Sequence, residues 1–281
     1  MSLTLKNVKR IAVKIFKRVC LMGSILFIKR GRRSIRHVIL ADFDLLVAAN
    51  EDVGRNILLF RNFEPEEAAF FRKEIQPTDI CFDIGGNVGF FTMLMAARAK
   101  HGAVHVFEPI PFNAALIQTN ALLNEFKNVF VRNFAVGSSS GTAQFSIAVD
   151  SAYSSMRSTG RRREESSIAV PVITLDHYVT KYDVGRVDIL KVDVEGAEGM
   201  VVSGAMGILS NRAIRPRMIL LELFEVNLRP FETDVQTIVN EMINHGYSAS
   251  ALIGQKLEPL NVGMINKFHN IIFTSEVWAR R

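Results

Sequence analysis

The stretch Asp79–Gly89, with the sequence DICFDIGGNVG, decides the fold. Its apolar run Ile80–Ile84 predicts a short buried strand, which the two following glycines end. A helix is expected over residues 88–100. A strand that ends in a glycine turn and continues into a helix leaves backbone N–H groups open to a ligand. The turn therefore predicts a ligand site at the carboxyl end of the strand, beside Asp83.

The glycine pattern differs from the dinucleotide fingerprint Gly-x-Gly-x-x-Gly. Asn87 stands where that fingerprint has its middle glycine. Asp83, Gly85 and Gly89 instead form the pattern Asp-x-Gly-x-x-x-Gly. This pattern suits a ligand that has no pyrophosphate.

A second strand, Ala103–Phe107, is followed directly by Glu108. A carboxylate at the end of this strand can accept hydrogen bonds from both hydroxyls of a ribose. Together with the glycine turn, Glu108 predicts a nucleoside-containing ligand.

From these residues onward, the chain resembles class I S-adenosylmethionine-dependent methyltransferases and, within them, the FkbM family. The resemblance extends from about Glu74 to Glu225 and more weakly to Ile272, so it leaves the first sixty or so residues uncovered. It rests on the motifs FDIGGNVGFFTMLMA, VHVFEP, FAVGSSSGTAQF, TLDHY and VDILKVDVEGAEGMVVSGA.

Strand and helix patterns alternate along the chain, which predicts a doubly wound α/β fold with a mostly parallel, seven-stranded sheet. Residues 1–60 are expected to form a basic N-terminal extension or cap, and residues 61–281 the methyltransferase domain. A hairpin of residues 142–149 and 168–173 is expected beside the site. Five further strands are predicted: Val129–Asn133, Val187–Asp193, Arg217–Leu223, Tyr247–Ile253 and Asn270–Phe273. The other expected helices are Glu64–Glu74, Pro111–Glu125, Ala197–Leu209 and Thr233–Asn244.

The basic charge is concentrated at the N-terminus. The chain has 34 Lys and Arg against 28 Asp and Glu, and eleven of the basic residues precede Asp42, where no acid occurs. The remainder is net acidic, so a nucleic-acid partner is not expected. Two cysteines argue against a disulfide framework, and a cytoplasmic location fits this composition.

Between Leu5 and Val19, within the N-terminal segment of residues 1–36, apolar positions recur at helical spacing with Lys and Arg on the other face, which predicts a basic amphipathic helix. The apolar run Val19–Ile28 is shorter than the roughly 20 residues that span a bilayer. One interpretation is peripheral contact with an anionic membrane surface, at the inner face. The alternative is that this helix packs on the domain or on a second subunit. The oligomeric state is left open.

The resemblance implies a set of residues that bind S-adenosylmethionine. Asp83 is expected to hold the cofactor's amino group, and Glu108 its ribose hydroxyls. The general class I pattern has an Asp before a small residue at the third strand, where this chain has Phe134 before Ala135, so only backbone or Asn133 contacts to the adenine are expected. The remaining cofactor residues expected are Gly85, Asn87 and Gly89 in the loop, Pro109 at the adenine, and Asp193.

Catalysis is assigned to the fourth strand, where Lys191, Asp193 and Glu195 alternate and would share one face. Methyl transfer needs an acceptor oxygen aligned behind the methyl group and a base that takes its proton. Asp193 is the first candidate base, Lys191 would hold it ionised, and Glu222 is a second candidate base. The alternative for each is a structural ion pair or turn.

Three residues are assigned to the acceptor: Glu195, Asp176 and Ser155. A run of arginines, Arg161–Arg163, could meet an acidic acceptor or be a solvated loop. No metal ion is assigned, because nothing in the spacing of the acids requires one.

The function that the resemblance implies is methyl transfer from S-adenosylmethionine to a hydroxyl of a sugar, a glycan or a related natural product. Two alternatives stay open. One is a nicotinamide-dependent sugar-modifying enzyme, which the missing middle glycine disfavours. The other is a non-catalytic module that keeps the nucleotide pocket.

Overall fold

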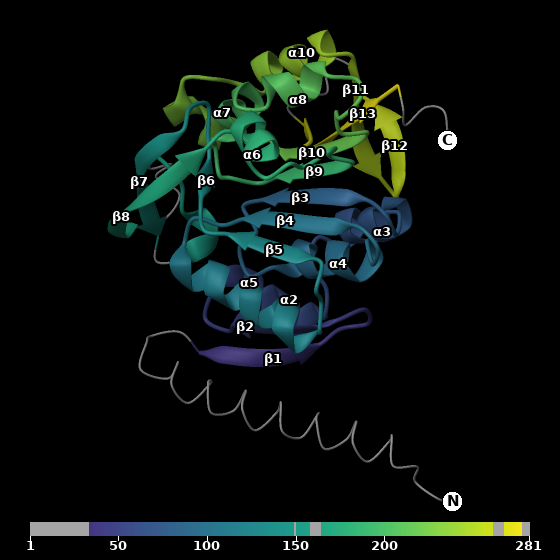
Figure 1. Ribbon diagram of the computed structural model, residues 1–281. Helices are drawn as coiled ribbons and strands as arrows, with labels where there is room; N and C mark the ends of the chain where they lie inside the picture. The colour runs from purple at the N-terminus through teal and green to yellow at the C-terminus, as the bar shows by residue number, and fades with distance from the viewer. Residues whose placement is uncertain (1–33, 149, 158–163, 261–266, 277–281) are drawn as a thin grey trace, which may run out of the picture.

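The computed structural model describes residues 34–148, 150–157, 164–260 and 267–276. Eight strands form its central sheet: β3 (Ile80–Ile84), β4 (Ala103–Phe107), β5 (Val129–Arg132), β9 (Ile189–Val192), β10 (Met218–Glu222), β11 (Tyr247–Ile253), β12 (Lys256–Pro259) and β13 (Asn270–Ser275). Their order is β12-β11-β13-β10-β9-β3-β4-β5 (Figure 1). The five strands from β10 to β5 are parallel, and β13 lies antiparallel between β10 and β11.

The predicted α/β class with a mostly parallel sheet is confirmed, but the sheet has one strand more than the seven predicted. The extra strand is β12, which pairs antiparallel with β11. The two strands are joined by Gly254 (φ 55°) and Gln255 (φ 66°), so both turn residues have the positive φ of a tight hairpin. A Gly-Gln pair is a weaker sequence signal for such a turn than Asn-Gly.

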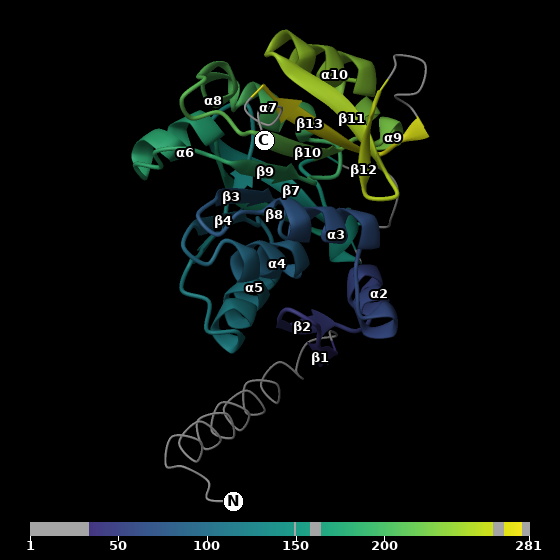
Figure 2. The same ribbon diagram turned by 90° about the vertical axis from the view of Figure 1, so that its right-hand side faces the viewer.

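Helices cover both faces of the sheet, because the strand residues alternate between two apolar cores. In β10, Met218 and Leu220 join the core formed with α3, α4 and α5, whereas Ile219 and Leu221 join the core formed with the other helices. The first group comprises α3 (Pro65–Glu74), α4 (Phe90–Arg98) and α5 (Pro111–Leu123). The second comprises α6 (Leu175–Lys181), α7 (Glu198–Ser203), α8 (Met206–Ser210), α9 (Glu225–Leu228) and α10 (Val235–Asn244). Figure 2 shows α10 and α4 on either side of the strands.

The single helix predicted over Ala197–Leu209 is wrong, since the chain forms α7 and α8 with a break at Gly204. A Cβ atom at Gly204 would lie 2.1 Å from the carbonyl oxygen of Gly137. The carboxylate of Asp176 then accepts hydrogen bonds from the backbone N–H groups of Gly207 and Ile208, at 2.7 and 2.9 Å. A new helix therefore starts at this point.

The described part of the N-terminal extension belongs to the same core as the domain. It consists of β1 (Ile35–Ile39), β2 (Asp44–Ala48) and α2 (Asp52–Phe60). Buried residues of all three elements, such as Val47 and Ile57, join the core of α3, α4 and α5. The amide of Asn120 in α5 also bonds both the N–H and the C=O of Leu46. The boundary expected at residue 60 therefore does not separate two cores.

A second, three-stranded sheet lies beside the central one and contains the predicted hairpin. Its strands are β6 (Ala135–Val136), β7 (Gly141–Ala148) and β8 (Glu164–Ile173), in the order β6-β8-β7. β7 and β8 are antiparallel, as expected. A short 3₁₀ helix, η1 (Ser151–Tyr153), follows β7, and a second one, η2 (Arg229–Phe231), follows α9.

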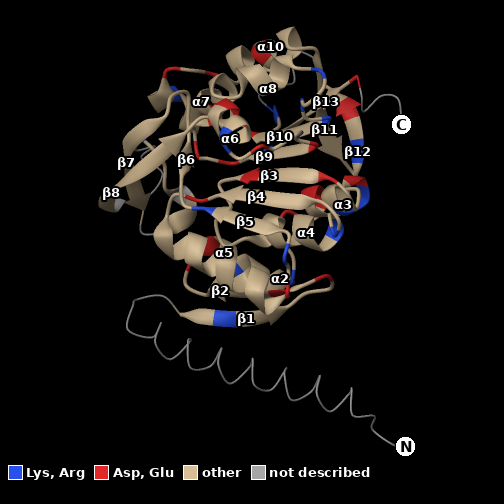
Figure 3. Ribbon diagram, viewed as in Figure 1, with Lys and Arg blue, Asp and Glu red and all other residues tan. Residues whose placement is uncertain are grey.

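The predicted amphipathic helix and the loop Arg161–Arg163 lie outside the described residues. Within the described part of the chain, no helix combines the length and the apolar character that crossing a membrane requires. In Figure 3 the central strands are mostly tan, with charged residues mainly near their ends.

Candidate functional site

A cavity of about 230 Å³ lies at the carboxyl ends of β3, β4, β9 and β10. This is the edge at which open α/β sheets bind ligands. Residues of α2 and of the second sheet also line it. Asp52 in α2 is tied to the start of η1, which follows the second sheet, because its N–H donates to the carboxylate of Asp150 at 2.6 Å. The cavity is therefore bordered by parts of the chain that lie far apart in sequence.

The glycine turn after β3 brings backbone atoms to the cavity. Gly85 and Gly89 have φ values of 85° and 88°, and Asn87 has a φ of 49°. A Cβ atom at Gly85 would lie 1.8 Å from the carbonyl oxygen of Asp193. Glycine is thus required at residue 85, both for its conformation and for the close approach of β9. Gly85 and Asn87 line the cavity, whereas Gly89 ends the turn at the start of α4.

Asp83 is a buried carboxylate at the end of β3. Its Oδ2 accepts a hydrogen bond from the hydroxyl of Thr92 at 2.5 Å, and its Oδ1 has no hydrogen-bond partner among the described residues. Burial raises the pKa of Asp83, and the charge of Lys191 opposes this rise. Since Asp83 lines the cavity, its second oxygen is available to a donor on a ligand.

Glu108 is buried at the end of β4 and also lines the cavity. Its two oxygens accept backbone hydrogen bonds from Asn87 at 2.8 Å and from Ile110 at 2.9 Å. Burial raises the pKa of Glu108 to about 8, although these two bonds favour the ionised form. Each oxygen keeps a lone pair, so the carboxylate can accept two further hydrogen bonds.

The residues expected near the adenine divide into two groups. Pro109, Phe134 and Ala135 line the cavity. Asn133 instead donates from its side-chain amide to the carbonyl oxygens of Glu108 and Pro109, at 2.8 and 3.0 Å. Asn133 therefore fixes the turn after β4 and is not among the lining residues.

Lys191 and Asp193 form an ion pair at the end of β9, with Nζ and Oδ2 3.0 Å apart. The ammonium group is buried, and it lies 5.0 Å from the ring centroid of Phe91. Burial alone would lower the pKa of Lys191, but the charges of Asp193, Asp83 and Glu64 together raise it above its ordinary value. Lys191 is therefore a permanent cation in the cavity.

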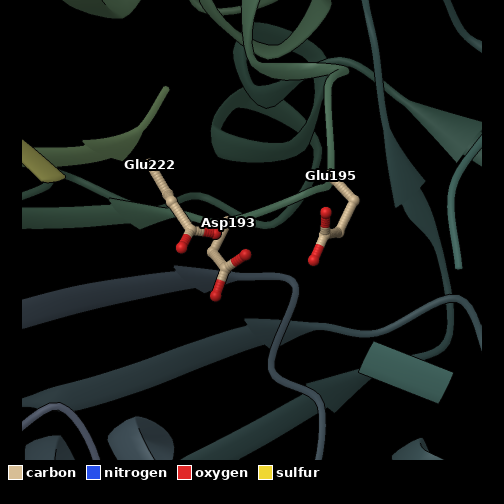
Figure 4. A group of neighbouring side chains, drawn as sticks. All are labelled: Asp193, Glu195 and Glu222. Carbon is tan, nitrogen blue, oxygen red and sulfur yellow. The ribbon is translucent and has the colours of Figure 1, made fainter. Parts of the chain in front are cut away.

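Three carboxylates approach one another beside this lysine: Asp193, Glu195 and Glu222 (Figure 4). One oxygen of each lies within 4.8 Å of the others, close enough to hold a metal ion in principle. Burial and the neighbouring Asp193 raise the pKa of Glu222 well above its ordinary value. A proton on Glu222 thus relieves the repulsion between these acids.

Glu195 does not continue the strand, so the prediction that Lys191, Asp193 and Glu195 share one strand face is wrong. β9 ends at Val192, and Glu195 has a left-handed φ of 55°. Its side chain accepts a hydrogen bond from the amide of Asn227 at 2.6 Å. Glu195 still lines the cavity, from the turn rather than from the strand.

Glu198 holds this turn from the first residue of α7. Its Oε1 accepts hydrogen bonds from the N–H groups of Val194 and Gly196, at 3.1 and 3.2 Å. Burial raises the pKa of Glu198 to about 7. Glu198 does not line the cavity; it orients the backbone that follows Asp193.

Sequence reasoning missed Glu64, which lines the cavity from the N-terminal end of α3. Its φ and ψ of 43° and 71° are left-handed, a conformation that costs a residue other than glycine on the order of 1 kcal/mol. The pKa of Glu64 is raised to about 7, chiefly by desolvation; the charge of Lys191 opposes this rise, and the charge of Asp193 adds to it. In the sequence, Glu64 resembled an ordinary acid at a helix start, and only the tertiary fold places it near Lys191.

Two residues assigned to the acceptor do not line the cavity. Asp176 uses both carboxylate oxygens to cap α8, which explains its place in the motif without a substrate. Ser155 is buried, and its hydroxyl donates to the carbonyl oxygen of Glu195 at 2.8 Å. The structure thus brings Glu195 to the cavity and gives Asp176 and Ser155 supporting positions.

The cavity and the doubly wound sheet define an α/β enzyme of the class I methyltransferase type. Residues 83–249, more than half of the chain, match the methyltransferase FkbM domain. The chain belongs to this family and is a methyltransferase that uses S-adenosylmethionine. This assignment removes the nicotinamide-dependent alternative.

Two curated relatives carry names that state a substrate. The 31-O-demethyl-FK506 methyltransferase FkbM of Streptomyces tacrolimicus is 23% identical over 159 residues, covering 47% of this chain and 61% of the relative. The hexuronic acid methyltransferase AglP of Haloferax volcanii is 27% identical over 139 residues, covering 50% of this chain and 55% of the relative. The chain therefore spans little more than half the length of these relatives.

Similar solved structures include two complexes with S-adenosylhomocysteine. One is an O-methyltransferase from Bacillus cereus, with a TM-score of 0.44, 14% identity and coverage of 76% of this chain and 82% of that one. The other is SMU.1697c, a methyltransferase from Streptococcus mutans, with a TM-score of 0.44, 10% identity and coverage of 75% and 96%.

The residues present fit S-adenosylmethionine, which carries an ammonium, a carboxylate, a sulfonium and a ribose. The buried Oδ1 of Asp83 has no partner among the described residues and suits a donor such as the ammonium. Gly85 leaves the backbone accessible, and Glu108 can accept two hydroxyl hydrogen bonds. The many acids of the cavity also suit a ligand with a net positive charge.

Proposed function

We propose that this protein methylates a hydroxyl group of a sugar, a glycan or a related natural product. The observation that carries the proposal is the ion pair of Lys191 and Asp193, with Glu222 beside it, in the same cavity as the glycine turn and Glu108. The name of one relative, a 31-O-demethyl-FK506 methyltransferase, supports transfer to an oxygen, and the name of the other, a hexuronic acid methyltransferase, supports an acceptor of the sugar class.

In this proposal the cavity has two ends. The cofactor end consists of Asp83, the turn of residues 85–89 and Glu108, with Pro109 and Ala135 at the adenine. The acceptor end consists of Glu64, Lys191, Asp193, Glu195 and Glu222. The cofactor supplies an electrophilic methyl group on a sulfonium.

Asp193 is the proposed base at the acceptor end. An ionised carboxylate can take the proton of an acceptor hydroxyl as the oxygen attacks, and Lys191 holds Asp193 ionised. Burial and the neighbouring Asp193 raise the pKa of Glu222 well above its ordinary value, so Glu222 has a high affinity for a proton. The lysine therefore lets one member of the acid cluster remain a base at neutral pH.

The test follows an isotope-labelled methyl group from S-adenosylmethionine into sugar, glycan and macrolide acceptors. We expect labelled product that resists mild alkali, because a methyl ether is stable where a methyl ester is cleaved. Label on nitrogen, or label released by alkali, would contradict the proposal.

Asp193→Asn tests the proposed base. Loss of a general base typically costs 10²- to 10⁴-fold, so turnover should fall at least about 100-fold while cofactor still binds. Asp183→Asn is the matched control, since Asp183 is exposed and has a φ of 51°, which Asn adopts readily. Unchanged turnover in Asp193→Asn would remove Asp193 as the base.

A further inference from the structure

Glu64 occupies a strained position that its local structure does not explain. It is the N-cap residue of α3, yet its side chain makes no capping hydrogen bond within the described part of the chain. The backbone is left-handed, and the next residue, Pro65, starts the helix. A residue other than glycine keeps such a conformation where the surroundings require it, often at functional sites.

The surroundings of Glu64 are the acceptor end of the cavity. Its charge interacts with Lys191, Asp193 and Asp83, and it contributes to the raised pKa of Glu222. Its side chain is half-buried and lines the cavity. Glu64 reaches the site from the segment before α3, whereas Asp193 and Glu222 reach it from the central strands.

Charge at the acceptor end is unbalanced. Among the described residues that line the cavity, Lys191 is the single Lys or Arg, and it is already paired with Asp193 at 3.0 Å. Seven acids line the same cavity: Asp52, Glu64, Asp83, Glu108, Asp193, Glu195 and Glu222. An acceptor with an anionic group would be repelled by these carboxylates, and no unpaired cation among the described lining residues would offset the repulsion.

Aromatic rings complete the acceptor end. Phe63, which directly precedes Glu64, and Phe224, two residues after Glu222, line the cavity. Phe224 is stacked on His269 with ring centroids 3.8 Å apart. Aromatic faces pack against the apolar faces of rings and attract cations. Together with carboxylates that accept hydrogen bonds, they suit a ring that carries hydroxyl or ammonium groups.

We propose that Glu64 is a specificity-determining residue that faces the acceptor. With Glu222 it selects acceptors whose neighbouring groups are hydroxyls or an ammonium, and it rejects acceptors with a carboxylate or phosphate beside the methylated hydroxyl. The proposal rests on the proposed methyl transfer to a hydroxyl. It predicts that a neutral sugar or an amino sugar is accepted and that a hexuronic acid is rejected.

The test uses three analogues of S-adenosylmethionine in which nitrogen replaces the sulfur and carries a short arm in place of the methyl group. The arms end in a hydroxyl, an ammonium or a carboxylate, so they probe the acceptor end without a known acceptor. Calorimetry at pH 8, where Glu64 is mostly ionised, gives the Kd of each. The carboxylate arm should bind at least about tenfold more weakly than the other two.

Glu64→Gln removes the charge and keeps the size of the side chain. In this variant the ratio of the Kd for the carboxylate arm to the Kd for the hydroxyl arm should fall at least about fivefold. Its Kd for S-adenosylhomocysteine should stay within about twofold of wild type. Glu66→Gln, an exposed acid in the same helix turn, is the control and should behave as wild type.

Several results would overturn the proposal. One is that the wild type binds the analogue with the carboxylate arm as tightly as the analogue with the hydroxyl arm. Another is that Glu64→Gln weakens the binding of all three analogues by the same factor. A third is that Glu64→Gln changes the Kd of S-adenosylhomocysteine as much as it changes the Kd of the analogues. Failure of the wild type to bind S-adenosylhomocysteine would instead contradict the underlying methyltransferase function, so the two failures are distinct.

Discussion

At the cofactor end, Asp83 and Glu108 receive hydrogen bonds from the chain itself: a threonine hydroxyl for Asp83 and two backbone N–H groups for Glu108. At the acceptor end, Glu64, Asp193 and Glu222 instead face one another around one buried ammonium. The first arrangement is built for binding, with its donors fixed by backbone. Burial raises pKa values at both ends, to about 8 for Glu108 and to about 7 for Glu64. The second arrangement differs because several acids interact around one cation, which suits proton transfer.

Gly85→Ala should have the largest effect on stability, because it breaks the cofactor end. The new Cβ would lie 1.8 Å from the carbonyl oxygen of Asp193, and the φ of 85° disfavours any residue with a side chain. Overpacking and backbone strain together predict a loss of about 3 kcal/mol in the free energy of unfolding. Urea unfolding measures it.

Gly141→Ala is the matched control, because no atom lies within 4 Å of its Cβ position among the described residues. Its unfolding free energy should stay within about 0.5 kcal/mol of wild type. Equal effects at Gly85 and Gly141 would show that the turn is not the constrained element inferred above.

Lys191→Met tests the acceptor end. Removing the ammonium leaves Asp193 beside Glu222, Glu64 and Asp83 without its cation. Breaking a buried pair in this way predicts a loss of about 2–3 kcal/mol at pH 8, less than for a fully buried pair because Asp193 is partly exposed. The loss should shrink at pH 5, where Glu64, whose pKa is about 7, is protonated and no longer repels Asp193.

Lys181→Met provides the comparison for the lysine substitution. Lys181 is exposed in the last turn of α6, so its replacement should change stability by less than about 0.5 kcal/mol. If Lys191→Met lowers the free energy of unfolding by the same amount at pH 5 and pH 8, Lys191 stabilises the fold by packing and not by its charge.

Glu198→Gln should have a smaller effect, visible in the pH dependence of stability. Burial raises the folded-state pKa of Glu198 from 4.5 to about 7, so its contribution is complete below pH 4.5 and is lost as the pH rises through 7. Glutamine does not titrate. Between pH 5 and 8, wild type should therefore lose about 2 kcal/mol of stability relative to the variant. Parallel pH profiles in urea unfolding would contradict this cause.

A larger share of the residues expected at the cofactor than of those expected at the acceptor lines the cavity, because the former come from contiguous motifs. Asp83, the glycine turn and Glu108 follow two strands whose apolar runs are easily recognised, and the structure places all of them at one cavity. Glu64 was missed because its proximity to Lys191 arises from tertiary packing of α3. No local spacing reveals that contact.

Two errors in the predicted elements have related causes. The break between α7 and α8 depends on Gly137 and on the carboxylate of Asp176, both far from the break in sequence. The same hydrogen bonds engage both carboxylate oxygens of Asp176 at the start of α8. Apolar periodicity in the sequence indicates which face of a helix is buried. It does not indicate a cap supplied by a residue far away in sequence.

Calorimetric titration of S-adenosylmethionine into the wild type and into Glu108→Ala tests whether this cavity binds the cofactor. We expect binding to the wild type and at least about a tenfold weaker Kd in the variant, because the two lost hydrogen bonds are worth about 0.5–1.5 kcal/mol each. Glu108→Ala must remain folded, as checked by its thermal unfolding. Equal affinity for both proteins, or no binding to the wild type, would contradict the assignment of this cavity as the cofactor site.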